Sequence, residues 1–123
     1  EYAVASLKVA HLIIIGHSGC GGVAGCHAMC SGEAPELEAT SSFVGRWMDI
    51  LRPGFERVHG KADDEIRALE QEAVLISLEN LMTFPFVRTA VEGGDLSLHG
   101  LWTDIGDGGL QHFDAESRTF QQV

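Results

Sequence analysis

A run of four aliphatic residues that leads into a glycine-rich turn constrains the fold of this chain more than any other stretch. Leu12–Ile15 is followed over residues 16–22 by Gly-His-Ser-Gly-Cys-Gly-Gly. A short apolar run rich in β-branched residues and bounded by turn residues is typical of a strand buried on both faces in a parallel sheet. Residues 21–30 can then form a helix. The pattern predicts a strand–turn–helix unit of an α/β fold, in which ligands bind at the carboxyl ends of the strands.

Two side chains that can bind metals lie in this turn, three positions apart. An imidazole from His17 and a thiolate from Cys20 suit tetrahedral Zn²⁺, and Gly19 between them lets the backbone bend so that both point at one ion. However, a His at a strand end is often an ordinary hydrogen-bonding residue, and a Cys is often simply buried. The spacing alone makes the pair candidate zinc ligands and leaves both interpretations open.

The rest of the chain reads as helices followed by strands. Residues 1–9 are predicted to form the last part of a helix. A polar connector is expected at residues 33–39 and a loop at residues 55–61. Further helices are predicted from Ser41 or Ser42 to Leu51 (ended by Pro53-Gly54), from Asp63 to Leu81 and from Pro85 to Glu92. Alternating residues from Leu96 to Thr103 indicate a strand, with 110–113 as its hairpin partner. The predicted fold class is α/β, a mainly parallel sheet flanked by helices, with one or two antiparallel edge strands near the C-terminus.

Composition and charge narrow the possible function classes. The chain has 123 residues, the size of one domain, with 45% hydrophobic and 21% charged residues, as in a typical globular protein. Its formal net charge of -10 disfavours nucleic acid and anionic membranes as partners, because both need basic patches. No apolar run approaches the roughly 20 residues of a membrane-spanning helix. We therefore expect no nucleic-acid partner and no membrane insertion.

Several ordered motifs together resemble one family. The stretch Gly-His-Ser-Gly-Cys-Gly-Gly-Val at 16–23 is similar to the second metal-binding motif of β-class carbonic anhydrases, which has the form G-H-x-x-C-G-G/A-V. The resemblance continues at Ser77-Leu78-Glu79-Asn80-Leu81 and Phe84-Pro85-Phe86-Val87-Arg88, and then over residues 94–100 and 104–110. It covers nearly the whole chain apart from the middle.

The resemblance implies a reaction and a cofactor. It implies zinc-dependent reversible hydration of CO₂ to bicarbonate, with His17 and Cys20 as two of three protein ligands of Zn²⁺. The backbone N–H of Gly21 would face the substrate or an anion. Members of the family also carry an upstream C-x-D-x-R motif, which supplies the third ligand and an Asp–Arg pair, on a strand that pairs beside the Leu12–Ile15 strand. None of the three cysteines here begins such a motif.

Residues 1–123 are therefore expected to be the C-terminal portion of a β-carbonic anhydrase domain, with no catalytic acid–base residue of their own. The expected partners are the upstream segment or chain and further copies in a homo-oligomer built from dimers. An oligomer is expected because this small core should leave several apolar side chains uncovered: Phe43, Trp47, Phe84 and Phe86. Carbonyl sulfide or carbon disulfide hydrolysis in the same family, and a non-catalytic truncated paralogue acting as a subunit, are alternatives.

The remaining cysteines and histidines have simpler interpretations. Cys26 and Cys30, four residues apart on a predicted helix, are expected to be buried small side chains rather than ligands of a second metal with His27. His99 is expected to make a structural hydrogen bond. His11, His59 and His112 are expected at the surface or at the ends of elements. An odd cysteine count without a disulfide framework predicts the cytoplasm or another reducing compartment, such as the chloroplast stroma or a carboxysome.

Overall fold

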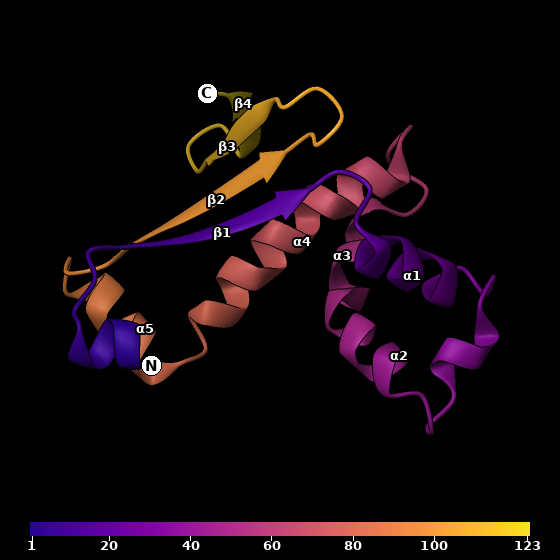
Figure 1. Ribbon diagram of the computed structural model, residues 1–123, viewed down its shortest axis with the longest axis horizontal. Helices are drawn as coiled ribbons and strands as arrows, with labels where there is room; N and C mark the ends of the chain where they lie inside the picture. Colours follow the sequence, from indigo (N-terminus) through magenta and orange to yellow (C-terminus); the bar gives the residue numbers. More distant parts are fainter.

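A four-stranded mixed sheet with one long helix packed on it forms the centre of the computed structural model, which describes all residues from 1 to 123 (Figure 1). The strands are β1 (His11–His17), β2 (Ser97–Thr103), β3 (Leu110–Asp114) and β4 (Thr119–Gln122), in that order across the sheet. β1 pairs in parallel with β2, and the other two pairings are antiparallel. The predicted α/β class with an antiparallel C-terminal edge is therefore confirmed, and that edge has two strands.

Helices gather at the two ends of the sheet, as Figure 1 shows. The group at the carboxyl end of β1 is α1 (Gly21–Cys30), η2 (Pro35–Glu38), α2 (Phe43–Met48), η3 (Asp49–Leu51) and α3 (Arg52–Val58). η1 (Tyr2–Ser6) and α5 (Pro85–Glu92) lie at the opposite end, and α4 (Glu65–Leu81) runs between the two groups along the sheet. The carboxyl end of β1 therefore lies beside the helices that follow it directly in the chain and beside α4.

Side-chain caps start two of the helices where the sequence predicts them. The Ser42 hydroxyl accepts a hydrogen bond from the Gly45 N–H at 3.0 Å, and an Asp64 carboxylate oxygen accepts one from the Arg67 N–H at 3.0 Å. Each cap pairs a backbone donor that has no partner within the helix. The predicted starts of α2 and α4 are therefore confirmed.

The loop predicted at residues 55–61 is wrong over most of its length, because α3 occupies residues 52–58. Pro53 was expected to end a helix, but it lies in the first turn of α3, where a missing N–H removes no intrahelical hydrogen bond. The new helix buries Phe55 and Val58 against Val23 of α1 and Leu69 of α4. Burial of these apolar side chains favours a helix over a solvated loop.

Two glycines allow α4 to approach the sheet closely. A Cβ on Gly16 of β1 would lie 2.6 Å from Val74 Cγ2 and 3.3 Å from the Glu70 carbonyl oxygen. A Cβ on Gly100 of β2 would lie 2.9 Å from Val74 Cγ1. Gly16 pairs with Trp102 and Gly100 with Ile14 in the parallel ladder, so the two glycines lie on neighbouring strands beneath the same helical residue.

The expectation that β1 is buried on both faces is wrong for this chain. β1 is an edge strand of the sheet, and its exposed and half-buried residues alternate. Ile13 and Ile15 are 53% and 61% exposed, whereas Leu12 and Ile14 are half-buried. The reason is that α4 covers one face of β1, and no element among residues 1–123 covers the other.

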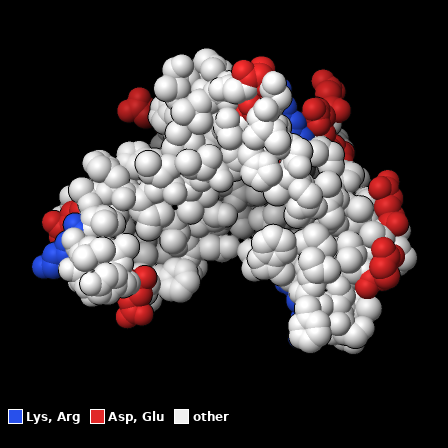
Figure 2. Space-filling model, in the orientation of Figure 1, with Lys and Arg blue, Asp and Glu red and all other residues white.

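In Figure 2 the charged side chains lie along the periphery of the molecule. An uncharged hollow lies between the two end groups of helices. No single helix has both the length and the apolar character needed to cross a bilayer. α4 and α5 meet those requirements only when taken together, and the chain bends by 91° between them.

We predict that Gly16→Ala lowers the free energy of unfolding by about 1–3 kcal/mol, because the added methyl group overpacks the contact between β1 and α4. Unfolding midpoints in urea measure the effect. Gly21→Ala is the matched control, since a Cβ there meets no atom within 4 Å. Equal stability of Gly16→Ala and the control would contradict close packing as the reason for the glycine.

Candidate metal centre

The turn between β1 and α1 holds the two predicted zinc ligands. β1 ends at His17, and Cys20 is the N-cap residue of α1. Gly19 has a φ of +66°, in the left-handed region that glycine adopts without steric cost, so the bend expected at this position is present. The Cys20 side chain makes no capping hydrogen bond. Its sulfur therefore remains available to another partner.

Ser18 ties this turn to the loop after β2. Its N–H donates to the Thr103 carbonyl at 2.9 Å, and its hydroxyl donates to Asp104 Oδ1 at 3.1 Å and accepts from the Ile105 N–H at 2.9 Å. The Gly106 N–H and then the Ser18 hydroxyl lower the pKa of Asp104 below its usual value. Asp104 is thus an ionised acceptor that holds the candidate ligand turn in place.

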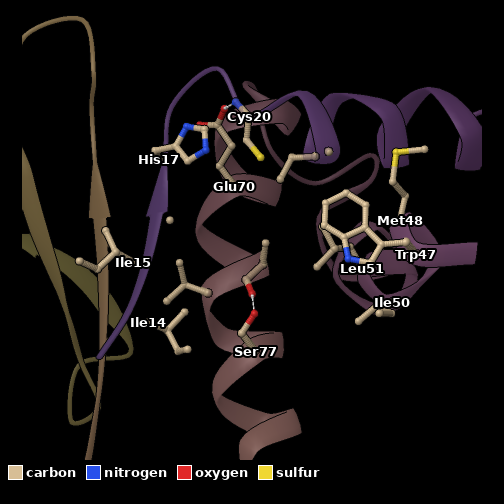
Figure 3. A pocket seen from close by; sticks show the side chains of 15 residues that line it. Ile14, Ile15, His17, Cys20, Trp47, Met48, Ile50, Leu51, Glu70 and Ser77 are labelled. Carbon is tan, nitrogen blue, oxygen red and sulfur yellow. Dashed lines mark hydrogen bonds between the residues drawn. The ribbon is translucent and has the colours of Figure 1, made fainter. Parts of the chain in front are cut away.

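Glu70 of α4 supports the turn from the other side, as Figure 3 shows. This residue is only 4% exposed, and its Oε1 accepts a hydrogen bond from the Cys20 N–H at 3.3 Å. Glu70 belongs to none of the motifs in the sequence. The one signal that could have drawn attention to it is an acidic residue between the apolar positions Leu69 and Val74 of a helix that packs on the core.

The His17 ring is held in one tautomer. Its Nδ1 lies 2.9 Å from the Ser18 carbonyl oxygen, which can only accept, so Nδ1 carries a proton, and in the neutral ring Nε2 then has a free lone pair. Histidines that ligate metals through one nitrogen usually donate the other ring N–H to a carbonyl or carboxylate. The donor set therefore fits Zn²⁺: a neutral imidazole with a free Nε2 and an uncapped cysteine in the same turn.

A largely apolar cavity of about 450 Å³ opens beside the two candidate ligands (Figure 3). His17, Cys20 and Glu70 supply its polar end, and Gly22 lines it, whereas Gly21 does not. Its apolar walls come from β1, α1, α2, η3 and α4: Ile14, Ile15, Val23, Trp47, Met48, Ile50, Leu51, Ala73 and Val74. No third His, Cys, Asp or Glu completes a three-ligand group with His17 and Cys20.

The other predicted roles of cysteine and histidine can be compared with the structure directly. Cys26 is fully buried, its sulfur lies 3.9 Å from that of Cys30, and burial raises its pKa to about 12, so it stays a thiol rather than a thiolate ligand. His99 makes its structural hydrogen bond with His11, at 3.0 Å between Nε2 and Nδ1. The burial expected for Cys26 and the hydrogen bond expected for His99 are therefore confirmed, whereas Cys30, also expected to be buried, is only half-buried.

His27 has partners that the sequence analysis did not foresee. It does not join a site with Cys26 and Cys30, and its Nε2 instead lies 2.7 Å from Glu65 Oε2. The same carboxylate oxygen lies 3.1 Å from Nδ1 of His59, which is exposed as expected. The three residues come from α1, the end of α3 and the start of α4.

The chain is similar to proteins of one known family. A carbonic anhydrase family model matches residues 1–110. The chain is 38% identical to carbonic anhydrase 1 of Escherichia coli O157:H7 over 98% of its length and 54% of that protein. It is 32% identical to β carbonic anhydrase 3 of Arabidopsis thaliana over 97% of its length and 47% of that protein. The chain thus spans about half the length of these curated relatives.

Solved structures agree with the sequence relatives. The β-carbonic anhydrase CcaA superposes with a TM-score of 0.79 at 27% identity, over all of this chain and 55% of that one. One of two structures described as tetrameric β-carbonic anhydrases of the filamentous ascomycete Sordaria macrospora has a TM-score of 0.67 at 26% identity, over 94% of this chain and 57% of that one. On the family match, the curated relatives and the shared fold, this chain belongs to the β-carbonic anhydrase family.

Proposed function

We propose that this chain supplies two zinc ligands, His17 and Cys20, to an enzyme that reversibly hydrates CO₂ to bicarbonate, the general reaction of its family. The observation that carries the proposal is the His17 ring, whose Nδ1 donates to the Ser18 carbonyl and leaves Nε2 free beside Cys20 at the polar end of an apolar cavity. Because the chain spans about half of its curated relatives, the activity is proposed for the assembled protein.

The chain's own residues prepare the metal centre electrostatically. When bound, Zn²⁺ lowers the pKa of a coordinated water to about 7, so that hydroxide forms near neutral pH. Cys20 is the N-cap residue of α1, so it lies at the helix N-terminus, where the backbone N–H groups carry a partial positive charge. Three free cysteines support a reducing compartment, such as the cytoplasm, in which Cys20 would stay available to the metal.

Substrate and product would meet different surfaces. The apolar walls of the cavity suit CO₂, which is neutral and weakly hydrated, and they disfavour bulk water next to the metal centre. Bicarbonate carries a charge and suits the backbone N–H of Gly21, the first residue of α1. Gly21 is exposed, and apart from its chain neighbours and the helix backbone no atom lies within 4 Å of the position that a Cβ would take.

We also propose that polypeptide upstream of Glu1, carrying a C-x-D-x-R motif, completes the site. Support comes from β1, an edge strand whose Ile13 and Ile15 are more than half exposed. A strand added at this edge would pair its free backbone groups and help to cover the isoleucines. Its cysteine would be the third protein ligand, and its Asp–Arg pair would supply the general base.

A homo-oligomer built from dimers is proposed for the same protein. Large apolar side chains on α2 and before α5 are uncovered: Phe43 is 82%, Trp47 64% and Phe84 49% exposed. Exposed apolar patches of this kind usually mark interfaces. The uncharged hollow of Figure 2 lies between the two helical groups that carry these residues. The similarity to a protein described as tetrameric supports the proposal.

The first prediction concerns the ligands. Cys20→Ser in the protein that includes the upstream segment should reduce bound zinc well below one equivalent, because an alcohol is a far weaker zinc ligand than a thiolate. Native mass spectrometry measures the zinc content. Cys30→Ser, on the same helix but outside the cavity, is the matched control and should retain zinc. Stoichiometric zinc in Cys20→Ser would refute the assignment.

The second prediction concerns the activity. Residues 1–123 with added zinc should hydrate CO₂ at least about 10²-fold more slowly than the protein that includes the upstream segment, because general-base assistance alone contributes about 10²–10⁴. Stopped-flow measurement of the pH change follows the reaction. Full activity of residues 1–123 would show that the catalytic machinery lies elsewhere. Hydrolysis of carbonyl sulfide or carbon disulfide without CO₂ hydration by the longer protein would favour the alternative substrates, and no activity at all would favour a non-catalytic subunit.

The third prediction concerns assembly. The protein that includes the upstream segment should have at least the mass of a dimer in light scattering at micromolar concentration. Trp47→Asp should shift it toward monomer, because a charge is costly in an apolar interface. Val123→Asp is the control, since Val123 is 76% exposed at the end of the chain. A stable, active monomer would exclude the proposed oligomer.

A further inference from the structure

We infer that His27, His59 and Glu65 form a second divalent-metal site, separate from His17 and Cys20, which binds Zn²⁺ through two nitrogens and one oxygen. One ligand atom from each residue lies within 4.8 Å of the other two. His27 Nε2 is 2.7 Å and His59 Nδ1 is 3.1 Å from the same carboxylate oxygen, Oε2 of Glu65. Two imidazoles and one carboxylate, with an open fourth position, are a common ligand set for zinc.

The distances leave little rearrangement to be made. Zn–N and Zn–O bonds of about 2.0–2.1 Å place neighbouring atoms of a tetrahedral site about 3.3 Å apart. The two observed contacts with Glu65 Oε2, 2.7 and 3.1 Å, must open by about 0.6 and about 0.2 Å to reach that value, and the two imidazole nitrogens already lie within 4.8 Å of each other. Without metal, His27 Nε2 and His59 Nδ1 must each carry a proton, because the carboxylate oxygen that they contact only accepts hydrogen bonds. With metal, each ring would hold its single proton on the other nitrogen.

Neighbouring groups hold the ligands in this arrangement. Glu65 Oε1 accepts a hydrogen bond from the Gly60 N–H at 2.7 Å, which leaves Oε2 directed at the imidazoles. The Phe55 ring stacks on His59 at 4.6 Å and meets the edge of His27 at 5.4 Å between centroids. Phe55 is itself 93% buried, since its exposed fraction is 7%. Ligands fixed by packing and outer hydrogen bonds lose less entropy when a metal binds.

Exposure and ligand type define the ion that fits. The side chains of His27 and Glu65 are 19% and 23% exposed, whereas that of His59 is 55% exposed, so an ion could enter from the His59 side with water as a fourth ligand. Imidazole ligands favour Zn²⁺ and similar transition metals over Mg²⁺ and Ca²⁺, which take oxygen ligands. The formal net charge of -10 favours any cation in addition.

A metal ion at this site would stabilise the packing of the two helices next to the candidate ligand turn. His27 lies on α1, which starts directly after Cys20, and Glu65 begins α4, which carries Glu70. A bound ion would therefore cross-link α1 and α4 at a second point besides the hydrogen bond from the Cys20 N–H to Glu70. The inference needs neither CO₂ hydration nor zinc at His17 and Cys20, so it can stand or fall separately from the proposed function.

Cobalt binding to residues 1–123 at pH 7.5 tests the site, because Co²⁺ in a nitrogen–oxygen site gives visible bands without the ultraviolet charge-transfer band of a thiolate ligand. We expect the Cys20→Ser chain to bind about one equivalent with that spectrum, and zinc to displace it. His59→Ala and Glu65→Gln in the same background should weaken binding at least about 10-fold, as expected for lost ligands. His112→Ala, an exposed histidine outside the cluster, is the control and should bind normally.

Thermal unfolding gives a second readout that does not depend on the spectrum. Zinc should raise the Tm of the Cys20→Ser chain but not that of Cys20→Ser/His59→Ala, because only a ligand that binds the folded state stabilises it. Mg²⁺ should leave both unchanged. Absence of cobalt binding in the Cys20→Ser chain up to about 0.1 mM, or binding that His59→Ala and Glu65→Gln leave unaltered, would overturn the inference. The three residues would then form only a hydrogen-bonded cluster.

Discussion

The close approach of α4 to the parallel strands is the constraint on which the rest of the structure depends. Gly16 and Gly100 leave no side chain between the strands and Val74, so the helix backbone comes near enough for Glu70 to reach the Cys20 N–H. A larger residue at position 16 would have to displace Val74 and would also crowd the Glu70 carbonyl. The glycine before His17 therefore serves the turn indirectly, because it sets the distance of the helix that supports it.

The candidate ligand turn is held from two independent directions. Ser18 connects it to the loop after β2 through Thr103, Asp104 and Ile105, and Glu70 connects it to α4. These contacts join residues that are far apart in the sequence: Ser18 and Asp104 are separated by 86 positions, and Cys20 and Glu70 by 50. A flexible glycine-rich turn gains a defined geometry in this way, which metal ligands need to be placed before the ion arrives.

Local patterns were sufficient to predict much of the fold. The boundaries of α1, α4 and α5 follow from capping and glycine signals within a few residues of each end. α3 was missed because a proline after an apolar helix can end that helix or begin the next one, and only the burial of Phe55 and Val58 decides between them. The exposed face of β1 was not predicted because an apolar run indicates that a strand favours burial, but it does not indicate which polypeptide covers the strand.

The site residues that could not be predicted from the sequence depend on contacts between distant elements. Glu70 is one of several glutamates on α4, and its burial beneath Cys20 depends on the packing of the helix rather than on any nearby motif. In the same way, His27, His59 and Glu65 carry no recognisable spacing and meet only because α1, α3 and α4 pack around Phe55. Cys20, the N-cap residue of α1, thus contacts Glu70 of α4, and His27 of α1 contacts Glu65 of α4. A displacement of either helix would disturb the hydrogen bond under Cys20 and the histidine–carboxylate cluster together, so the geometry of the two sites is physically linked even though their ligands are distinct.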